Sequence, residues 1–128
     1  MTRTAQQIVA EARASITEIA VQDVAKGVAG ALIIDVREPA EYESGHLQGA
    51  INIPRGVLEF QVEAHPALGG ATEPELAVRD RPVVLYCRTG GRSALAALSL
   101  QEMGFKDVRS MAGGITAWQE AQLPLRLR

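Results

Sequence analysis

The chain has 128 residues, of which 47% are hydrophobic and 22% are charged. This composition is typical of one folded globular domain, and a chain of this length buries roughly two-thirds of its unfolded surface without help from disulfides or structural metals. The formal net charge of −2, with no long basic run, argues against a nucleic-acid partner. The one cysteine, Cys87, cannot form an internal disulfide, which favours a reducing, cytoplasmic compartment. Every apolar run falls short of a membrane span, and no signal peptide is expected.

The N-terminal part of the chain predicts a helix, a strand and a second helix. Apolar residues at helical spacing indicate a short amphipathic helix over residues 4–13. Residues 15–19 alternate like a short strand, and residues 22–28 return to a helical pattern. We therefore predict a helical extension over residues 1–14, followed by the main domain over residues 15–128.

The middle of the chain contains one strongly apolar strand and one segment that is difficult to interpret. Residues 31–36 form a continuous apolar run with Asp35 near its end, as expected for a strand that is buried on both faces. A helical turn is predicted over residues 40–44, and a short strand over residues 50–53. We interpret residues 56–81 as an insertion near the functional site.

The C-terminal part again alternates strands with helices. Residues 82–86 form a second apolar run of strand length, and residues 108–111 are predicted to be the last strand. Residues 93–103 are mostly good helix formers, followed by Gly104 at a helix C-cap position, and residues 115–121 predict a closing helix. Strands that alternate with helices imply a parallel sheet covered on both faces.

The turn after the strand over residues 82–86 is the strongest candidate for a chemical site. Cys87 ends that strand, and a helix begins near Ser93. If the turn curls into a cradle, the backbone N–H groups of residues 88–92 and the positive end of the helix dipole surround the sulfur. An anion is favoured there, so we expect Cys87 to be a thiolate nucleophile supported by Ser93.

Four neighbouring residues favour this reactive cysteine over a buried structural one. Gly90 and Gly91 permit the torsions and the close approach of a tight cradle. Arg88 and Arg92 add positive charge. A cysteine that only fills the core needs neither the two glycines nor the two arginines.

Three sequence motifs resemble the signatures of the rhodanese (sulfurtransferase) family in its single-domain form. They occur in the family's order and are residues 33–54 (IIDVREPAEYESGHLQGAINIP), the cysteine loop over residues 87–92, and Gly113-Gly114 with Trp118. The resemblance implies a three-layer α/β fold with a central parallel five-stranded sheet flanked by helices. It also implies a persulfide enzyme without a cofactor. Cys87 would take a sulfane sulfur from a donor such as thiosulfate and pass it to cyanide, a thiol or a sulfur-accepting protein.

The resemblance suggests roles for the side chains around the cysteine. We expect Arg92 to close the loop and Arg88 to face the donor, although the sequence leaves open which arginine points inward. Thr89 either donates its hydroxyl to the substrate or caps the turn. Asp35 and Arg37 end the neighbouring strand; they either support the cysteine loop or, as we favour, pair with each other to fix a turn.

The two histidines and the tryptophan are predicted to have structural rather than catalytic roles. His46 is expected to order a turn, His65 to lie solvated in the insertion, and Trp118 to belong to the core. Two histidines and one cysteine at wide spacing offer no metal-ligand cluster. Gln48 and Gln122 stand where the family often has proline and glycine, and both are expected at the surface.

Two alternative functions remain at this stage. A related dual-specificity phosphatase or arsenate reductase places histidine before the cysteine and arginine at the sixth position after it. Here Tyr86 precedes Cys87, and Arg92 is at the fifth position. The loop therefore fits a sulfur atom better than a phosphoryl group. The other alternative is a non-catalytic module that senses oxidants or docks a partner through the same thiol.

Overall fold

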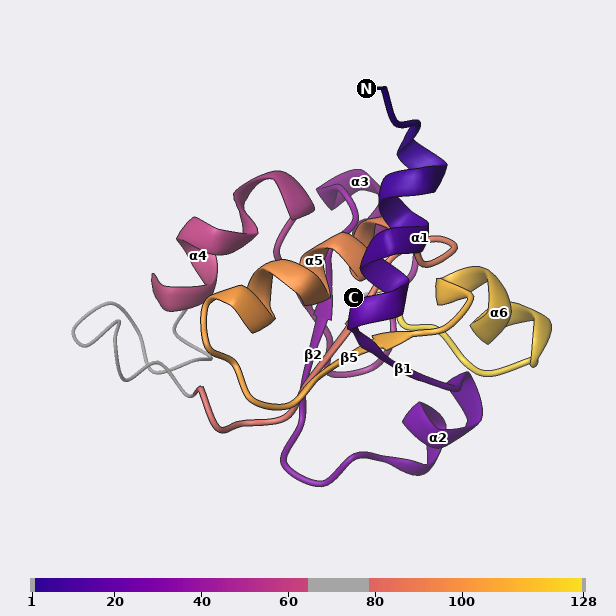
Figure 1. The fold of residues 1–128 in the computed structure, drawn as a ribbon. Coiled ribbons are helices and arrows are strands. Elements are labelled where there is room, and N and C mark those ends of the chain that lie inside the picture. The colour runs from indigo at the N-terminus through magenta and orange to yellow at the C-terminus, as the bar shows by residue number, and fades with distance from the viewer. Residues whose placement is uncertain (1, 65–78, 128) are drawn as a thin grey trace.

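The computed structural model describes residues 2–64 and 79–127, which form a five-stranded parallel sheet with helices on both faces (Figure 1). The strand order is β1-β5-β4-β2-β3. In chain order the elements are α1 (Ala5–Ser15), β1 (Thr17–Ile19), α2 (Val21–Lys26), β2 (Leu32–Asp35), α3 (Pro39–Glu43), β3 (Ile51–Asn52), η1 (Arg55–Val57), α4 (Leu58–Ala64), β4 (Val83–Tyr86), α5 (Gly91–Glu102), β5 (Val108–Met111) and α6 (Gly114–Glu120).

The two faces of the sheet carry separate apolar clusters. On one face, α4 and α5 bury Leu58, Val62 and Leu100 against β2 and β4. On the other face, α2 and α6 bury Val24 and Trp118. All four residues of the central strand β4 are buried, which explains why its sequence is a continuous apolar run rather than an alternating one.

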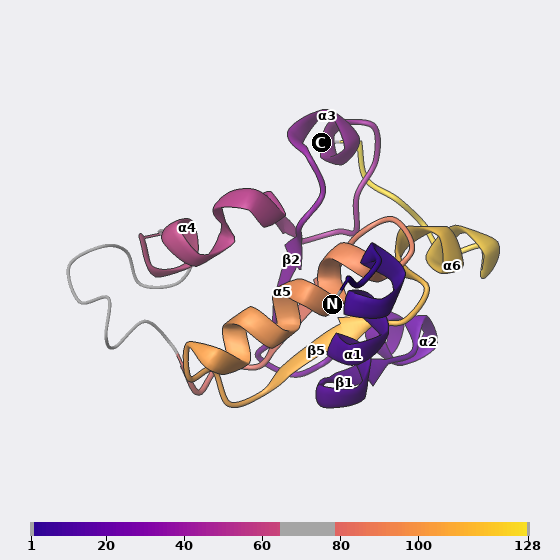
Figure 2. The same cartoon turned by 45° about the horizontal axis from the view of Figure 1, so that its top comes forward.

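The N-terminal helix α1 packs against α5, and the two helices lie side by side in both views (Figures 1 and 2). A capping box begins α1: the Thr4 hydroxyl accepts from the Gln7 amide, and the Gln7 side chain accepts from the Thr4 amide. Ala12 is the buried residue of α1. The helix thus continues the layer on the α5 face of the sheet.

The predicted elements agree with the observed order, with small shifts at their ends. Helix α5 begins at Gly91, two positions before the predicted start, and Gly104 adopts the expected left-handed C-cap with φ +95°. Part of the predicted insertion is helical, because α4 lies inside it. His65 lies outside the described residues. Gln122 is exposed and has φ +61°, a conformation that glycine adopts more easily.

Among the described residues, no helix combines the length and the apolar character needed to cross a membrane.

Candidate active site

Cys87 lies directly after β4, at the carboxyl edge of the sheet, where ligands bind in open α/β folds. The residue is 1% exposed. Its Sγ accepts hydrogen bonds from the backbone N–H of Gly90 at 3.1 Å and of Ser93 at 3.4 Å. Gly90 has φ +111°, a conformation that disfavours any residue with a β-carbon. The turn and the first turn of α5 therefore aim two amide dipoles at one buried sulfur, which stabilises an anion there.

A pair of buried serine hydroxyls extends this environment. Ser93 Oγ lies 3.6 Å from Cys87 Sγ and 3.2 Å from the carbonyl oxygen of Gly90. It also lies 2.8 Å from the hydroxyl of Ser110 in β5. Ser93 was predicted from the sequence as a supporting residue, whereas Ser110 was not. The available signal was a serine between Arg109 and Met111 in a predicted strand, because a hydroxyl that is buried in a sheet needs a hydrogen-bond partner.

The start of α6 holds the cysteine loop from its other side. The amides of Ile115 and Thr116 donate to the carbonyl oxygens of Cys87 and Arg88, at 2.9 and 3.0 Å. A β-carbon on Gly114 would lie 2.5 Å from the Arg88 carbonyl oxygen, well inside van der Waals contact. Gly114, in the third sequence motif, therefore allows the backbone at the start of α6 to pack directly against the backbone of the cysteine loop.

Arg92 joins the cysteine loop to α3. Its guanidinium donates two hydrogen bonds, at 2.8 and 3.2 Å, to the two carboxylate oxygens of Glu41. The Arg92 hydrogen bonds hold the pKa of the Glu41 carboxyl at about 2, below its ordinary 4.5. The same pairing raises the pKa of Arg92. Glu41 is therefore the partner through which Arg92 holds the loop against α3, and the sequence did not predict this pairing.

We expect Glu41→Gln to lower the free energy of unfolding by about 1 kcal/mol at pH 7, because both side chains remain about one-third exposed and solvent screens their attraction. A carboxyl whose pKa is depressed on folding stabilises the protein above its unfolded pKa, and the effect disappears as the pH falls through the folded value. The difference from wild type should therefore shrink between pH 4.5 and about 2.

Urea unfolding across this pH range measures that difference. Glu43→Gln on the same helix is the matched control, since Glu43 is exposed. A constant loss for Glu41→Gln at every pH would contradict the ion-pair assignment.

Arg88 and Thr89 occupy the exposed outer part of the loop. Within the described part of the chain, the Arg88 side chain forms no hydrogen bond or ion pair. Its guanidinium is therefore available to an anionic ligand, whereas that of Arg92 is engaged with Glu41. The roles of Arg88 and Thr89 toward a substrate remain predictions.

Asp35 and Arg37 pair with each other. Arg37 Nη2 lies 2.7 Å from Asp35 Oδ2, and the Arg37 backbone amide donates to Asp35 Oδ1 at 2.9 Å. The same Nη2 donates to the carbonyl oxygen of Gly45, and both side chains are almost fully buried. This geometry agrees with the alternative that we favoured, in which Asp35 and Arg37 pair with each other to fix the turn after β2. The pair also anchors the segment that follows α3 in the chain.

His46 and Trp118 also occupy the structural positions expected of them. His46 stacks on the Tyr42 ring at 3.8 Å, and its backbone exchanges two hydrogen bonds with Arg126. Trp118 is 6% exposed, and its indole N–H donates to the carbonyl oxygen of Pro124. Both residues therefore attach the C-terminal segment to the domain.

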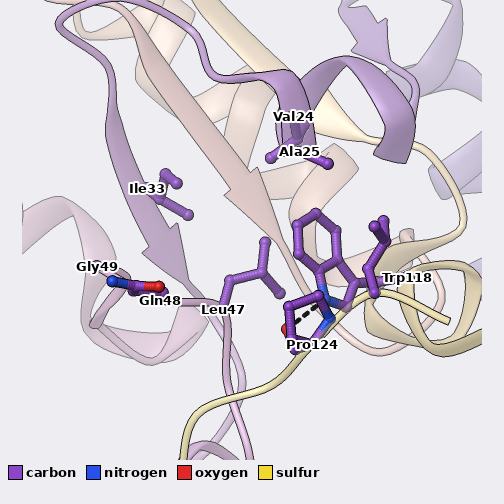
Figure 3. Close-up of a pocket in the computed structure, with 9 residues that line it drawn as sticks. Val24, Ala25, Ile33, Leu47, Gln48, Gly49, Trp118 and Pro124 are labelled. Atoms are coloured by element: carbon purple, nitrogen blue, oxygen red, sulfur yellow. Dashed lines mark hydrogen bonds between the residues drawn. The ribbon is translucent and has the colours of Figure 1, made fainter.

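Trp118 borders an apolar pocket of about 550 Å³ on the α2 and α6 face of the sheet (Figure 3). Ile33, Leu47 and Pro124 line it, with no ionisable side chain among its lining residues. This pocket therefore offers no acid, base or nucleophile. In the described ranges 2–64 and 79–127, no group of three or more histidine, cysteine or acidic side chains is placed to hold a metal ion.

Comparison with known proteins agrees with the fold and the loop. The family model for the rhodanese-like domain matches residues 19–121. The chain therefore belongs to the rhodanese-like domain family, as the three sequence motifs predicted. Both the five-stranded parallel sheet and the cysteine loop lie within the matched region, apart from the first two residues of β1.

Three similar proteins show the range of names within the family. A probable adenylyltransferase/sulfurtransferase, MoeZ, from Mycobacterium tuberculosis is 38% identical over 72% of this chain, but the match spans 21% of that longer protein. A thiosulfate sulfurtransferase, GlpE, from Shewanella oneidensis is 39% identical, over 70% of this chain and 76% of the relative. The third is a structure from Rhodopseudomonas palustris, described as a protein of unknown function and possible tyrosine phosphatase. It is 32% identical to this chain, with a TM-score of 0.81, and the match covers 98% of this chain and 96% of that protein.

Proposed function

We propose that this protein is a sulfurtransferase that carries a sulfane sulfur on Cys87. The observation that carries the proposal is the buried Sγ with two backbone N–H groups directed at it. The same donors that stabilise a thiolate also stabilise the terminal anion of a persulfide. Family membership and the relatives named sulfurtransferases support the assignment.

The first half-reaction loads the cysteine. The Cys87 thiolate attacks the outer sulfur of thiosulfate and forms a new S–S bond. The S–S bond of thiosulfate breaks, and sulfite leaves with the electron pair. Two negative charges thus approach the loop with the donor, and the exposed guanidinium of Arg88 is suited to bind them.

The second half-reaction unloads the cysteine. Cyanide or a thiolate attacks the outer sulfur of the Cys87 persulfide, and the electron pair of the broken S–S bond returns to the Cys87 sulfur. Thiocyanate or a new persulfide is released. The amides of Gly90 and Ser93 stabilise the leaving thiolate, so the loop serves both steps.

Steady-state assays with thiosulfate and cyanide test this function. We expect many moles of thiocyanate per mole of protein, because the thiolate is regenerated in each cycle. A non-catalytic sensing or docking module would stop at one equivalent of sulfur per cysteine. A single equivalent would overturn the proposed turnover.

Phosphatase activity is the second candidate, because the Rhodopseudomonas palustris relative is described as a possible tyrosine phosphatase. Two features of the loop disfavour it here. Arg92 follows Cys87 by five positions, which makes the cradle small for a phosphoryl group. Its guanidinium is also engaged by Glu41. We therefore expect hydrolysis of an aryl phosphate to be negligible beside sulfur transfer; equal rates would favour the phosphatase instead.

Arg88→Gln should lower kcat/KM for thiosulfate about tenfold, because an exposed guanidinium that binds an anionic donor contributes on the order of 1.4 kcal/mol. A neutral donor, such as a dialkyl trisulfide, should lose much less, since it has no charge for Arg88 to bind. Initial rates with both donors provide the comparison, and Arg88→Lys should recover part of the activity. Equal losses for the two donors would contradict this role.

A further inference from the structure

Helix α1 forms one wall of a groove beside the cysteine loop. The groove has a volume of about 630 Å³ and lies between one face of α1 and the loop residues Thr89 and Gly91. Val9 belongs to the apolar part of this wall and lies close to the loop: its Cγ2 is 3.7 Å from the position that a β-carbon on Gly91 would occupy. Helix α1 precedes residues 19–121, the region that the family model matches, so this wall lies outside the matched region.

Arg13 places a positive charge at the same junction. Its Nη2 lies 3.0 Å from the position that a β-carbon on Gly90 would occupy, and Gly90 is the residue whose amide binds the cysteine sulfur. Arg13 Nε meets Glu18 at 3.7 Å, which is a long and exposed ion pair. Such a pair is weak, so the guanidinium can engage another carboxylate at little cost.

The size of the groove indicates what kind of molecule it holds. Its volume of about 630 Å³ is larger than a thiosulfate ion needs. Ala5, Val9 and Ala10 give it an apolar wall, Gln6 and Thr89 add polar groups, and no acidic residue lines it. An organic molecule with an aliphatic body and at least one carboxylate matches this lining.

We propose that this groove binds the sulfur acceptor, a carboxylate-bearing organic thiol, and that Arg13 determines its specificity. The inference rests on the proposed sulfurtransferase function. The acceptor thiolate attacks the outer sulfur of the Cys87 persulfide, and an S–S bond forms between acceptor and sulfane sulfur. The S–S bond to Cys87 breaks, and its electron pair returns to the Cys87 sulfur. Arg13 binds the acceptor carboxylate through its planar guanidinium, which suits bidentate contact.

The test compares two acceptor thiols with thiosulfate as donor: glutathione, which carries two carboxylates, and 2-mercaptoethanol, which is neutral. For Arg13→Gln, we expect the KM for glutathione, relative to that for 2-mercaptoethanol, to rise about fivefold. In wild type, the KM for glutathione should also rise when NaCl increases from about 0.05 M to about 0.5 M, because salt screens an exposed ion pair. Arg13→Gln should lose that salt dependence.

Arg109→Gln is the matched control for charge. Arg109 is a partly exposed arginine in β5, and it pairs with Asp107. It does not line the groove, so the loss of its charge should leave the KM ratio unchanged. Ala10→Phe tests the groove independently of charge, because the larger side chain fills it and should raise the KM for glutathione more than that for 2-mercaptoethanol.

The outcomes separate this inference from the proposed function. If wild type turns over thiosulfate with cyanide, but both Arg13→Gln and Ala10→Phe fold and keep the wild-type KM ratio, the acceptor groove is wrong and the sulfurtransferase assignment stands. If wild type does not turn over thiosulfate with cyanide or any thiol, the proposed function fails first. If Arg13→Gln does not fold, the ratio measured for Ala10→Phe decides.

Discussion

Cys87→Ser is expected to abolish sulfur transfer, with kcat for thiosulfate and cyanide falling at least about a thousandfold. A serine oxygen fits the space of the sulfur but does not accept a sulfane sulfur from thiosulfate, so the covalent intermediate cannot form. The substitution should leave the amides of Gly90 and Ser93 in place, because the backbone of the turn and of α5 sets the position of these donors. The loss should therefore be chemical and not structural.

Intact mass spectrometry after incubation with thiosulfate identifies the carrier atom. Wild type should gain one sulfur atom, which cyanide then removes, and Cys87→Ser should gain none. Thermal unfolding of both proteins serves as the control for folding. A sulfur adduct that persists in the folded serine variant would show that another group carries the sulfur, since Cys87 is the one cysteine of the sequence.

The sequence was sufficient to predict the position of the cysteine loop, because that information is local. An apolar run of strand length, a cysteine, a short turn that contains two glycines and a helix-forming segment follow one another in the chain. Each step uses short-range rules: burial predicts the strand, glycine permits the turn, and periodicity predicts the helix. The observed β4, the loop and α5 follow this order.

Contacts between distant segments could not be predicted in the same way. Glu41 and Arg92 are 51 positions apart, and Ser93 and Ser110 are 17 apart. Their partners depend on which strands are neighbours, and the order β1-β5-β4-β2-β3 does not follow the chain. The packing of α1 beside the loop is a further example, since amphipathic periodicity predicts that a helix packs but not where it packs.

Gly114→Ala is expected to lower the free energy of unfolding by about 3 kcal/mol and to reduce sulfur transfer more than tenfold. The added β-carbon would lie 2.5 Å from the Arg88 carbonyl oxygen and 2.6 Å from that of Cys87, and both of these atoms are backbone. No change of side-chain rotamer can relieve this clash, because the clashing atoms belong to the backbone. Helix α6 must therefore shift away from the loop, which weakens the hydrogen bond from the Ile115 amide to the Cys87 carbonyl.

Gly30→Ala separates the clash from the ordinary cost of a left-handed backbone. Gly30 has φ +71°, close to the +60° of Gly114, but a β-carbon there meets nothing within 4 Å. Alanine at position 30 should cost only about 1 kcal/mol and leave activity unchanged. Denaturant unfolding and thiosulfate–cyanide turnover, measured on both variants, compare the two glycines directly. If Gly114→Ala costs no more than Gly30→Ala and keeps full turnover, α6 does not hold the cysteine loop, and the amides that face the sulfur are positioned by β4 and α5 alone.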